Sequence, residues 1–233
     1  MIDVLTFDLD DTFWENYPVM ARTEPGHYEW LDRQIGHAAT FPLEEYQQRR
    51  LEFAKRHPVR RGDFTWVRRE TLREMLVEFG LPTDEAARWA SEAIEHMLEL
   101  RHDITVFEEV PAMLVALSAQ YRLGAITNGN VDLRRLDIGK AFDVIINAGE
   151  FLAPKPDARA FLSALARLGH TPPSRAMHVG DSWQEDVLPA YRLGMKVAWI
   201  DAKNEHHSCP EGVYRLTHVR ELPALLERIE RTN

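Results

Sequence analysis

The sequence predicts an α/β fold with a parallel sheet and a helical insert after the first strand. Three observations lead to this prediction: one apolar strand pattern comes first, long helical patterns dominate residues 17–101, and short apolar segments alternate with helical patterns from Val106 onward. Alternation of strands and helices is typical of βα units on a parallel sheet with right-handed connections. The helical block therefore interrupts the sheet after its first strand.

The first two parts of the chain differ in their periodicity. Residues 4–7 are apolar and β-prone, and acidic residues and a threonine follow them, which is typical of a buried strand. Residues 17–101 carry helical patterns that break near Pro42, near Pro58 and Gly62, and again at residues 80–82. We expect about four helices there. Pro25 and Gly26 interrupt the first helical pattern, so we expect that helix to kink or break.

The remainder of the chain supplies the other strands and their covering helices. Short apolar segments predict strands at residues 121–127, 144–147, 176–180 and 196–200. Helical windows fall between and after them, near residues 108–120, 157–169, 184–193 and 220–231. We therefore expect a core formed by residues 1–14 and 104–233, and a helical insert formed by residues 15–103.

Composition narrows the classes of function. The 233 residues suit one large domain or one domain with an insert. A formal net charge of −9 argues against a chain that mainly coats nucleic acid or anionic lipid, so we expect a small ligand. No segment approaches the roughly 18 apolar residues that cross a bilayer. Because Cys209 is the single cysteine and no secretory signal pattern is present, we expect a reduced, cytoplasmic protein.

Polar residues follow the expected strands where ligand sites form. The first strand ends at residues 8–12 (Asp-Leu-Asp-Asp-Thr), another ends at residues 127–128 (Thr-Asn), and a third continues into residues 180–182 (Gly-Asp-Ser), with Asp186 one turn later. Lys155 lies in a loop after a further strand. Because ligands of open α/β sheets bind beyond the carboxyl ends of the strands, these residues predict one site.

Closely spaced carboxylates repel one another, and a bound cation would offset that repulsion. Mg²⁺ prefers carboxylates together with substrate phosphate oxygens, and we choose Asp8 and Asp181 as its ligands. Alternation along an extended chain places Asp8 and Asp10 on the same side, about 6.5 Å apart, so both carboxyls can flank one reacting phosphorus. Metal and ammonium offset the repulsion between a carboxylate nucleophile and a phosphate dianion. These residue types favour an aspartyl-phosphate route over hydrolysis by a histidine base.

In this order, the four clusters resemble the motifs of the haloacid dehalogenase-like hydrolase superfamily. The resemblance implies a Rossmann-like catalytic core with a helical cap between its first strand and the rest. It also implies a role for each motif residue: Asp8 as nucleophile, Asp10 as general acid and then base, Thr127 and Asn128 as ligands of the phosphoryl group, Lys155 as its counter-charge, the Asp10 carbonyl and the Asp8 and Asp181 carboxylates as Mg²⁺ ligands, and Asp186 in the outer shell of the metal.

Asp10 separates the reactions of that superfamily. Its dehalogenases resemble D-x-Y-G-T at the first motif and act without metal, because a halide leaves without a proton; this sequence has an acid there. Phosphonate cleavage uses a cap lysine, for which Lys55 is the one lysine between residues 15 and 101. We therefore expect a Mg²⁺-dependent phosphomonoester hydrolase. A sugar phosphomutase, which shares all four motifs, and a phosphate-binding regulator without turnover stay as alternatives.

Two features bear on the substrate, which we expect to be a small phosphorylated metabolite. Residues 5–24 and 125–130 are similar to a bacterial subgroup that dephosphorylates flavin mononucleotide and 5-amino-6-(5-phospho-D-ribitylamino)uracil. Residues 49–73 carry nine Lys or Arg against three acidic residues, with Phe64 and Trp66 among them. This segment either attracts an anionic ligand or forms a solvated helix face with core aromatics. The sequence makes no prediction of oligomeric state.

Other polar and aromatic residues have simpler explanations. His178 lies on an expected buried strand, so we expect a core residue with satisfied hydrogen bonds. Trp14 follows the first motif and is expected to pack between core and cap. His206, His207 and Cys209 lie in a polar loop without a fourth ligand at a suitable spacing, so we expect no soft-metal site there.

Overall fold

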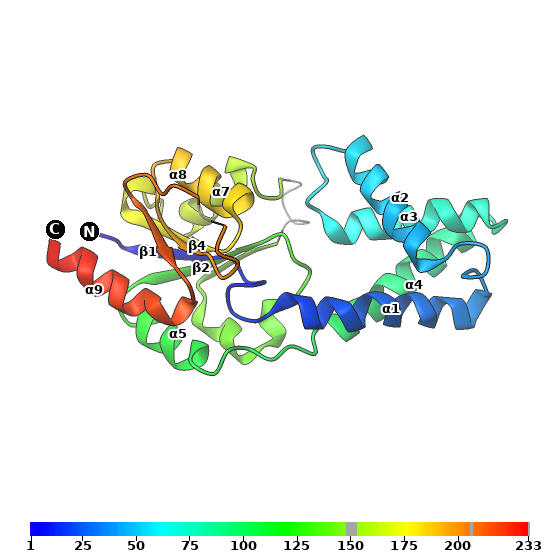
Figure 1. Cartoon of the computed structure of the whole chain (residues 1–233), viewed down its shortest axis with the longest axis horizontal. Helices are drawn as coiled ribbons and strands as arrows, with labels where there is room; N and C mark the ends of the chain where they lie inside the picture. The colour runs from blue at the N-terminus through cyan, green and yellow to red at the C-terminus, as the bar shows by residue number, and fades with distance from the viewer. Residues whose placement is uncertain (148–152, 206, 233) are drawn as a thin grey trace. The chain divides into compact units, whose positions relative to one another are not determined.

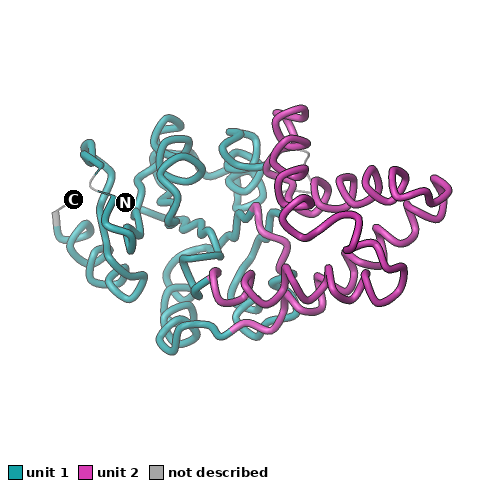
Figure 2. The backbone as a smooth tube through the Cα atoms, turned by 45° about the vertical axis from the view of Figure 1, so that its right-hand side comes forward, with its two compact units in different colours: residues 1–15, 105–127, 132–233 teal, residues 16–104, 128–131 magenta. Residues whose placement is uncertain are grey.

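A computed structural model describes residues 1–147, 153–205 and 207–232 of the chain. The chain divides into two compact units (Figure 2). The first comprises Met1–Glu15, Thr105–Thr127 and Asp132–Asn233, and the second comprises Asn16–Ile104 and Asn128–Val131. His206, which belongs to the polar loop discussed above, lies outside the described residues. None of the described helices is both long and apolar enough to span a membrane.

A parallel sheet forms the centre of the first unit. Over the described residues it has six strands in the order β3-β2-β1-β4-β5-β6, and every neighbouring pair is parallel. The strands are β1 (Val4–Phe7), β2 (Arg122–Thr127), β3 (Val144–Asn147), β4 (Ala176–Gly180), β5 (Lys196–Ile200) and β6 (Val213–Leu216). The central strand β1 is buried along its whole length, as expected for a strand covered on both faces. The predicted α/β class is confirmed.

Helices cover both faces of this sheet. In Figure 1, α7 (Ala158–Arg167) and α8 (Leu188–Arg192) lie on one face, and α5 (Val110–Ser118) and α9 (Leu222–Thr232) lie on the other. A π-helical turn (Trp183–Val187) precedes α8. Short 3-10 helices complete the unit at Leu133–Arg135, Asp137–Ala141, Pro173–Arg175 and Val219–Glu221. Each predicted helical window in this unit contains a helix.

The sixth strand was missed in the sequence. β6 carries Tyr214 and Arg215 between Val213 and Leu216, and only the two terminal residues are buried. It pairs with β5 alone at the edge of the sheet. An edge strand of four residues with two polar or exposed positions is too short to give a clear apolar pattern.

Four helices form the second unit within its described residues, as the breaks in the sequence predict: α1 (Asn16–Ile35), α2 (Leu43–Arg56), α3 (Phe64–Glu78) and α4 (Thr83–Arg101). Of the expected kink or break at Pro25 and Gly26, the break is wrong, because α1 continues through both residues. A Cβ on Gly26 would lie 2.9 Å from Leu100 Cδ1, so α1 and α4 pack closely there. This tertiary contact favours the continuous helix despite the proline.

Carboxylates of the same unit neutralise much of the basic segment. Trp66 packs under the Arg60 guanidinium, 4.1 Å from its ring centroid, and against the Phe53 ring at 5.0 Å. These contacts favour the simpler explanation, in which the segment is a solvated face with packed aromatics. The ion pairs join Arg49 to Glu45 and Glu78, Arg50 to Glu24, Arg56 to Glu74, Arg60 to Asp63, and Arg73 to Glu70.

Candidate active site

The carboxyl ends of β1 and β4 meet where the strand order of the sheet reverses. Asp8 directly follows β1 and Asp181 directly follows β4. The Asp8 backbone N–H donates to the Val179 carbonyl at 2.8 Å, which ties the two strand ends together. Such a reversal is the usual ligand site of an open α/β sheet. The fold therefore brings two motifs together that lie more than 170 positions apart in the sequence.

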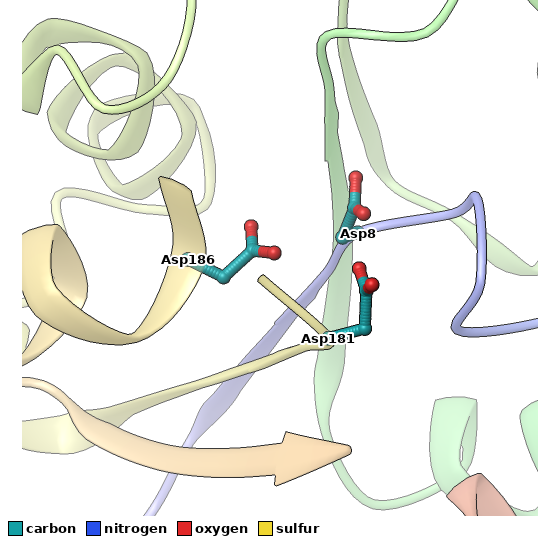
Figure 3. Close-up of side chains that lie close together, drawn as sticks. All are labelled: Asp8, Asp181 and Asp186. Atoms are coloured by element: carbon teal, nitrogen blue, oxygen red, sulfur yellow. The ribbon is translucent and has the colours of Figure 1, made fainter. Parts of the chain in front are cut away.

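Three carboxylates converge at this point (Figure 3). One oxygen each from Asp8, Asp181 and Asp186 lies within 4.8 Å of the others. Asp8 and Asp186 are buried, and the Asp181 side chain keeps 19% of its exposure. Close carboxylates with little water around them repel one another strongly, so a cation would stabilise the cluster.

Lys155 supplies one positive charge to the cluster. Its Nζ donates to Asp8 Oδ1 at 2.7 Å and to Asp186 Oδ1 at 2.6 Å, and the residue is 2% exposed. Burial disfavours the ammonium, but the Asp186 and Asp8 carboxylates outweigh it and hold the pKa of Lys155 above its ordinary value. The loop lysine chosen from the sequence therefore lies against both predicted carboxylates as a permanent cation.

Asp186 is held in place from several directions. Its Oδ2 accepts the Ser182 backbone N–H at 3.0 Å, and its Oδ1 lies 3.0 Å from His178 Nε2. A Cβ on Gly180 would lie 2.5 Å from Asp186 Cγ, so only glycine leaves room for the carboxyl. The residue sits in the π-helical turn, a feature that often occurs at functional sites. Burial opposes ionisation, but Lys155 and the His178 hydrogen bond lower the pKa of Asp186 to about 2.

The other two carboxyls hold their protons more tightly than usual. Burial, followed by repulsion from Asp186 and Asp11, raises the pKa of Asp181 to about 7. Burial also raises the pKa of Asp8, and repulsion from Asp186 and Asp181 adds to it, while Lys155 acts in the opposite direction. One lysine is thus too little charge for three carboxylates. The cluster therefore carries more negative than positive charge. Because Mg²⁺ prefers carboxylate oxygens as ligands, these residues fit that ion.

The rest of the first motif forms the turn after β1. Trp14 is fully buried, and its Nε1–H donates to Asp10 Oδ1 at 2.8 Å, a contact that the sequence analysis did not predict. Asp11 has a φ of 56°, a left-handed conformation that aspartate tolerates in turns. Lys203 Nζ lies 3.9 Å from Asp11 Oδ2 and from Asp181 Oδ2. Lys203 was also missed, although its position after β5 at the same sheet edge was a usable signal.

Thr127 is the last residue of β2, and Asn128 directly follows it. Ala125 of β2 is in register with Phe7 of β1, so Thr127 lies at the same edge of the sheet as Asp8. Thr127 is 2% exposed and Asn128 is 6% exposed. Thr127 belongs to the first unit, whereas Asn128 is grouped with the second. Their predicted contact with a phosphoryl group stays a prediction.

The fold and the acidic cluster define a class of α/β hydrolase, and comparison with known families agrees. The family model of haloacid dehalogenase-like hydrolases matches residues 2–194. The chain belongs to that family, and it is a phosphatase within it.

Individual relatives cover nearly the whole chain. The 5-amino-6-(5-phospho-D-ribitylamino)uracil phosphatase YigB of Escherichia coli K12 is 31% identical over 203 residues, 87% of this chain and 85% of that protein. A 2-haloacid dehalogenase structure from Pseudomonas syringae pv. Tomato DC3000 has a TM-score of 0.89 and 32% identity, covering 98% of this chain and 99% of its own. The magnesium-bound HAD-hydrolase YfnB of Bacillus subtilis shares the fold, with a TM-score of 0.69, 18% identity and coverage of 97% and 99%.

Proposed function

We propose that this phosphatase hydrolyses a small phosphomonoester through a phosphoryl group carried transiently on Asp8, with Mg²⁺ as its metal. The observation that supports this most is the convergence of three carboxylates and one buried ammonium at the β1 and β4 ends. A nucleophilic carboxylate needs nearby positive charge when it attacks a phosphate dianion. The relatives named above include a phosphatase and a magnesium-bound hydrolase, which favours the same chemistry.

Several residues act together in the first step. The Asp8 carboxylate forms the bond to phosphorus, while Lys155 orients it and balances the charge of the phosphoryl group, together with hydrogen bonds from Thr127 and Asn128. The Asp8 and Asp181 carboxylates and the Asp10 backbone carbonyl would hold Mg²⁺, which supplies further positive charge to the phosphoryl oxygens. As the bond to the ester oxygen breaks, protonated Asp10 gives its proton to the leaving alkoxide.

The second step reverses the role of Asp10. Now a carboxylate, it takes a proton from a water molecule that attacks the phosphorus, which releases inorganic phosphate and regenerates Asp8. Trp14 supports both steps because its indole N–H donates to Asp10 Oδ1 and holds that carboxyl in place. Asp186 holds Lys155 against Asp8 and orients the metal ligands from the outer shell.

For the natural substrate we propose a phosphorylated ribityl compound. YigB, whose name describes a phosphatase for 5-amino-6-(5-phospho-D-ribitylamino)uracil, matches over 87% of this chain. Flavin mononucleotide carries the same phosphorylated ribityl chain and is the second choice. The phosphate end of either compound suits the charged cluster of the first unit.

The test is a panel of phosphate esters measured with the wild-type protein, Asp8→Asn and the control Asp137→Asn. Asp137 is an exposed acid of the same unit that pairs with Lys140, so its loss leaves turnover unchanged. We expect wild-type and control to release phosphate with the highest kcat/KM for the ribitylaminouracil phosphate, and Asp8→Asn to fold normally without turnover. Substantial turnover by folded Asp8→Asn would contradict the proposed route.

The same experiment separates the alternatives. A phosphomutase would isomerise a sugar phosphate without releasing phosphate, and a regulator would bind the esters without turnover. The likeness to a 2-haloacid dehalogenase structure adds a third alternative. Release of chloride from 2-chloropropionate, without phosphatase activity, would favour it; we expect no chloride, because Asp10 provides the acid that an alkoxide needs and a halide does not.

A further inference from the structure

A line of buried hydrogen-bonded side chains leads from the sheet to Lys155. Thr6 of β1 and His178 of β4 are in register on neighbouring strands, and Thr6 Oγ1 lies 2.9 Å from His178 Nδ1. On the other side of the ring, His178 Nε2 lies 3.0 Å from Asp186 Oδ1. Thr6 and His178 have no exposed surface, and Asp186 is 1% exposed. The Phe161 ring meets the imidazole edge-on at 5.0 Å and fixes its plane.

The chemistry of the groups gives this line a direction. An ionised carboxylate only accepts hydrogen bonds, so His178 Nε2 must carry the proton and donate a hydrogen bond to Asp186. A neutral imidazole then has one acceptor left, Nδ1, and the Thr6 hydroxyl is the group that donates to it. The Asp186 carboxylate therefore sets the tautomer of His178, and the Thr6 hydroxyl satisfies the ring nitrogen that this tautomer leaves as an acceptor.

Three donors together fix both oxygens of Asp186. Lys155 Nζ and His178 Nε2 reach Oδ1, and the Ser182 backbone N–H reaches Oδ2. Without the histidine donor, the carboxyl would keep two partners and gain freedom to rotate. Lys155 would then lose part of the support that places its Nζ at 2.7 Å from Asp8 Oδ1.

We propose that Thr6 and His178 are positioning residues for phosphoryl transfer: the Thr6 hydroxyl donates to His178 Nδ1 and holds the ring, His178 orients Asp186, and Asp186 keeps Lys155 on the Asp8 nucleophile. This proposal rests on the proposed function, because it needs Asp8 to be the nucleophile. Outer groups of this kind act through the residues they orient, and their loss typically lowers activity about tenfold or more.

The decisive comparison is between two substitutions of Thr6. Thr6→Val keeps the shape of the side chain and removes the hydroxyl, whereas Thr6→Ser keeps the hydroxyl. With p-nitrophenyl phosphate and saturating Mg²⁺, we expect Thr6→Val to lose about tenfold in kcat with KM nearly unchanged, and Thr6→Ser to retain most of the activity. Thr71→Val is the control, because that buried hydroxyl donates to the Val67 carbonyl in its own helix.

A second variant keeps the test sharp if Thr6→Val proves unstable. In His178→Gln the amide nitrogen is as many bonds from Cα as Nε2 is, so it retains a donor for Asp186 and has no tautomers. We expect His178→Gln to keep most of the wild-type kcat, and the Thr6→Val change to cost nothing further in that background.

The proton positions are measurable in the whole wild-type protein without any turnover. In ¹⁵N-labelled protein, the chemical shifts of His178, assigned by their absence in His178→Gln, should show a protonated Nε2 and an unprotonated Nδ1. A protonated Nδ1, or equal kcat in folded Thr6→Val and Thr6→Ser, would overturn the proposal. Absence of phosphate release from the wild-type protein would instead contradict the proposed function, and the positioning role with it.

Discussion

Gly180 illustrates how a single missing side chain allows the site to form. The Cβ of an alanine there would lie 2.5 Å from Asp186 Cγ and 2.7 Å from Asp186 Oδ2. We predict that Gly180→Ala displaces the carboxyl, lowers kcat at least about tenfold and destabilises the protein by about 1–3 kcal/mol. Steady-state kinetics and thermal unfolding measure both effects.

Gly26→Ala is the matched control for that substitution. Its Cβ would meet only the end of the flexible Leu100 side chain, far from any proposed catalytic residue in the sequence. We expect unchanged kcat in the control. Equal kcat in Gly180→Ala and the wild-type protein would show that Asp186 does not need its observed position.

Trp14 offers a second test at the level of a single hydrogen bond. Trp14→Phe removes the N–H that donates to Asp10 Oδ1. Because Asp10 protonates the leaving oxygen in the proposed mechanism, we predict a larger loss of kcat for an alkyl phosphate than for p-nitrophenyl phosphate, whose leaving group needs little protonation. If both substrates slow equally, Trp14 supports the fold and not the acid.

Helix α1 carries a buried titratable group that makes the second unit sensitive to acid. His27 has no exposed surface, and its Nδ1 donates to the Thr23 carbonyl at 3.0 Å. Burial, together with repulsion from Arg68 and Arg50, lowers the pKa of His27 to about 4. The unfolded chain binds a proton near pH 6.5, whereas the folded helix does not. The contribution of His27 to stability is therefore full above pH 6.5 and falls as the pH is lowered toward 4.

The size of this effect follows from the shift of the His27 pKa. It amounts to at most about 3 kcal/mol at pH 4. Hydrogen exchange of amides in α1 should show faster opening as the pH drops from 7 to 4, after correction for the intrinsic rate. In His27→Gln this dependence should largely disappear, and an unchanged dependence in that variant would place its origin elsewhere.

The elements also show what the sequence reveals and what it does not. Residues 4–7, 144–147, 176–180 and 196–200 are strands at the predicted bounds, because each has a short, mainly apolar run. β6 was missed because Tyr214 and Arg215 interrupt such a run. The course of α1 through Pro25 depends on packing against α4, which no local pattern reports.

The sequence also predicted part of the candidate site. The polar ends of the strands identified Asp8, Lys155, Asp181 and Asp186, since a parallel sheet gathers the carboxyl ends of its strands at one edge. The contact between Thr6 and His178 spans 172 positions and depends on the pairing of β1 with β4. Such a register is a property of the folded sheet and cannot be inferred from residue types alone.

At the scale of the whole molecule, the proposed Mg²⁺ and protons compete for the same carboxyls. The pKa of Asp181 is raised from 3.8 to about 7, so the metal-free folded protein binds more protons than the unfolded chain between these values. The contribution of Asp181 to the stability of the metal-free protein therefore falls as the pH rises from about 4 to 7. Bound Mg²⁺ requires deprotonated carboxylates, so its stabilising effect grows over the same range.

Thermal unfolding tests this competition directly. We predict a larger rise of Tm on adding Mg²⁺ at pH 8 than at pH 5. Asp181→Asn should lose most of the Mg²⁺ effect and be less sensitive to pH in EDTA. A Mg²⁺ effect on Tm that is equal at both pH values, or unaltered in Asp181→Asn, would argue against metal binding by Asp181.

Trapping the proposed phosphoryl group on Asp8 tests the mechanism most directly. Wild-type protein is mixed with ³²P-labelled phosphomonoester and Mg²⁺, quenched with acid within the first turnover and digested for peptide mapping. We predict label on the peptide that contains Asp8, with a mass increase on that residue, and its disappearance as phosphate is released. Rapid phosphate release with no labelled peptide at any time, or label on another residue, would contradict nucleophilic attack by Asp8.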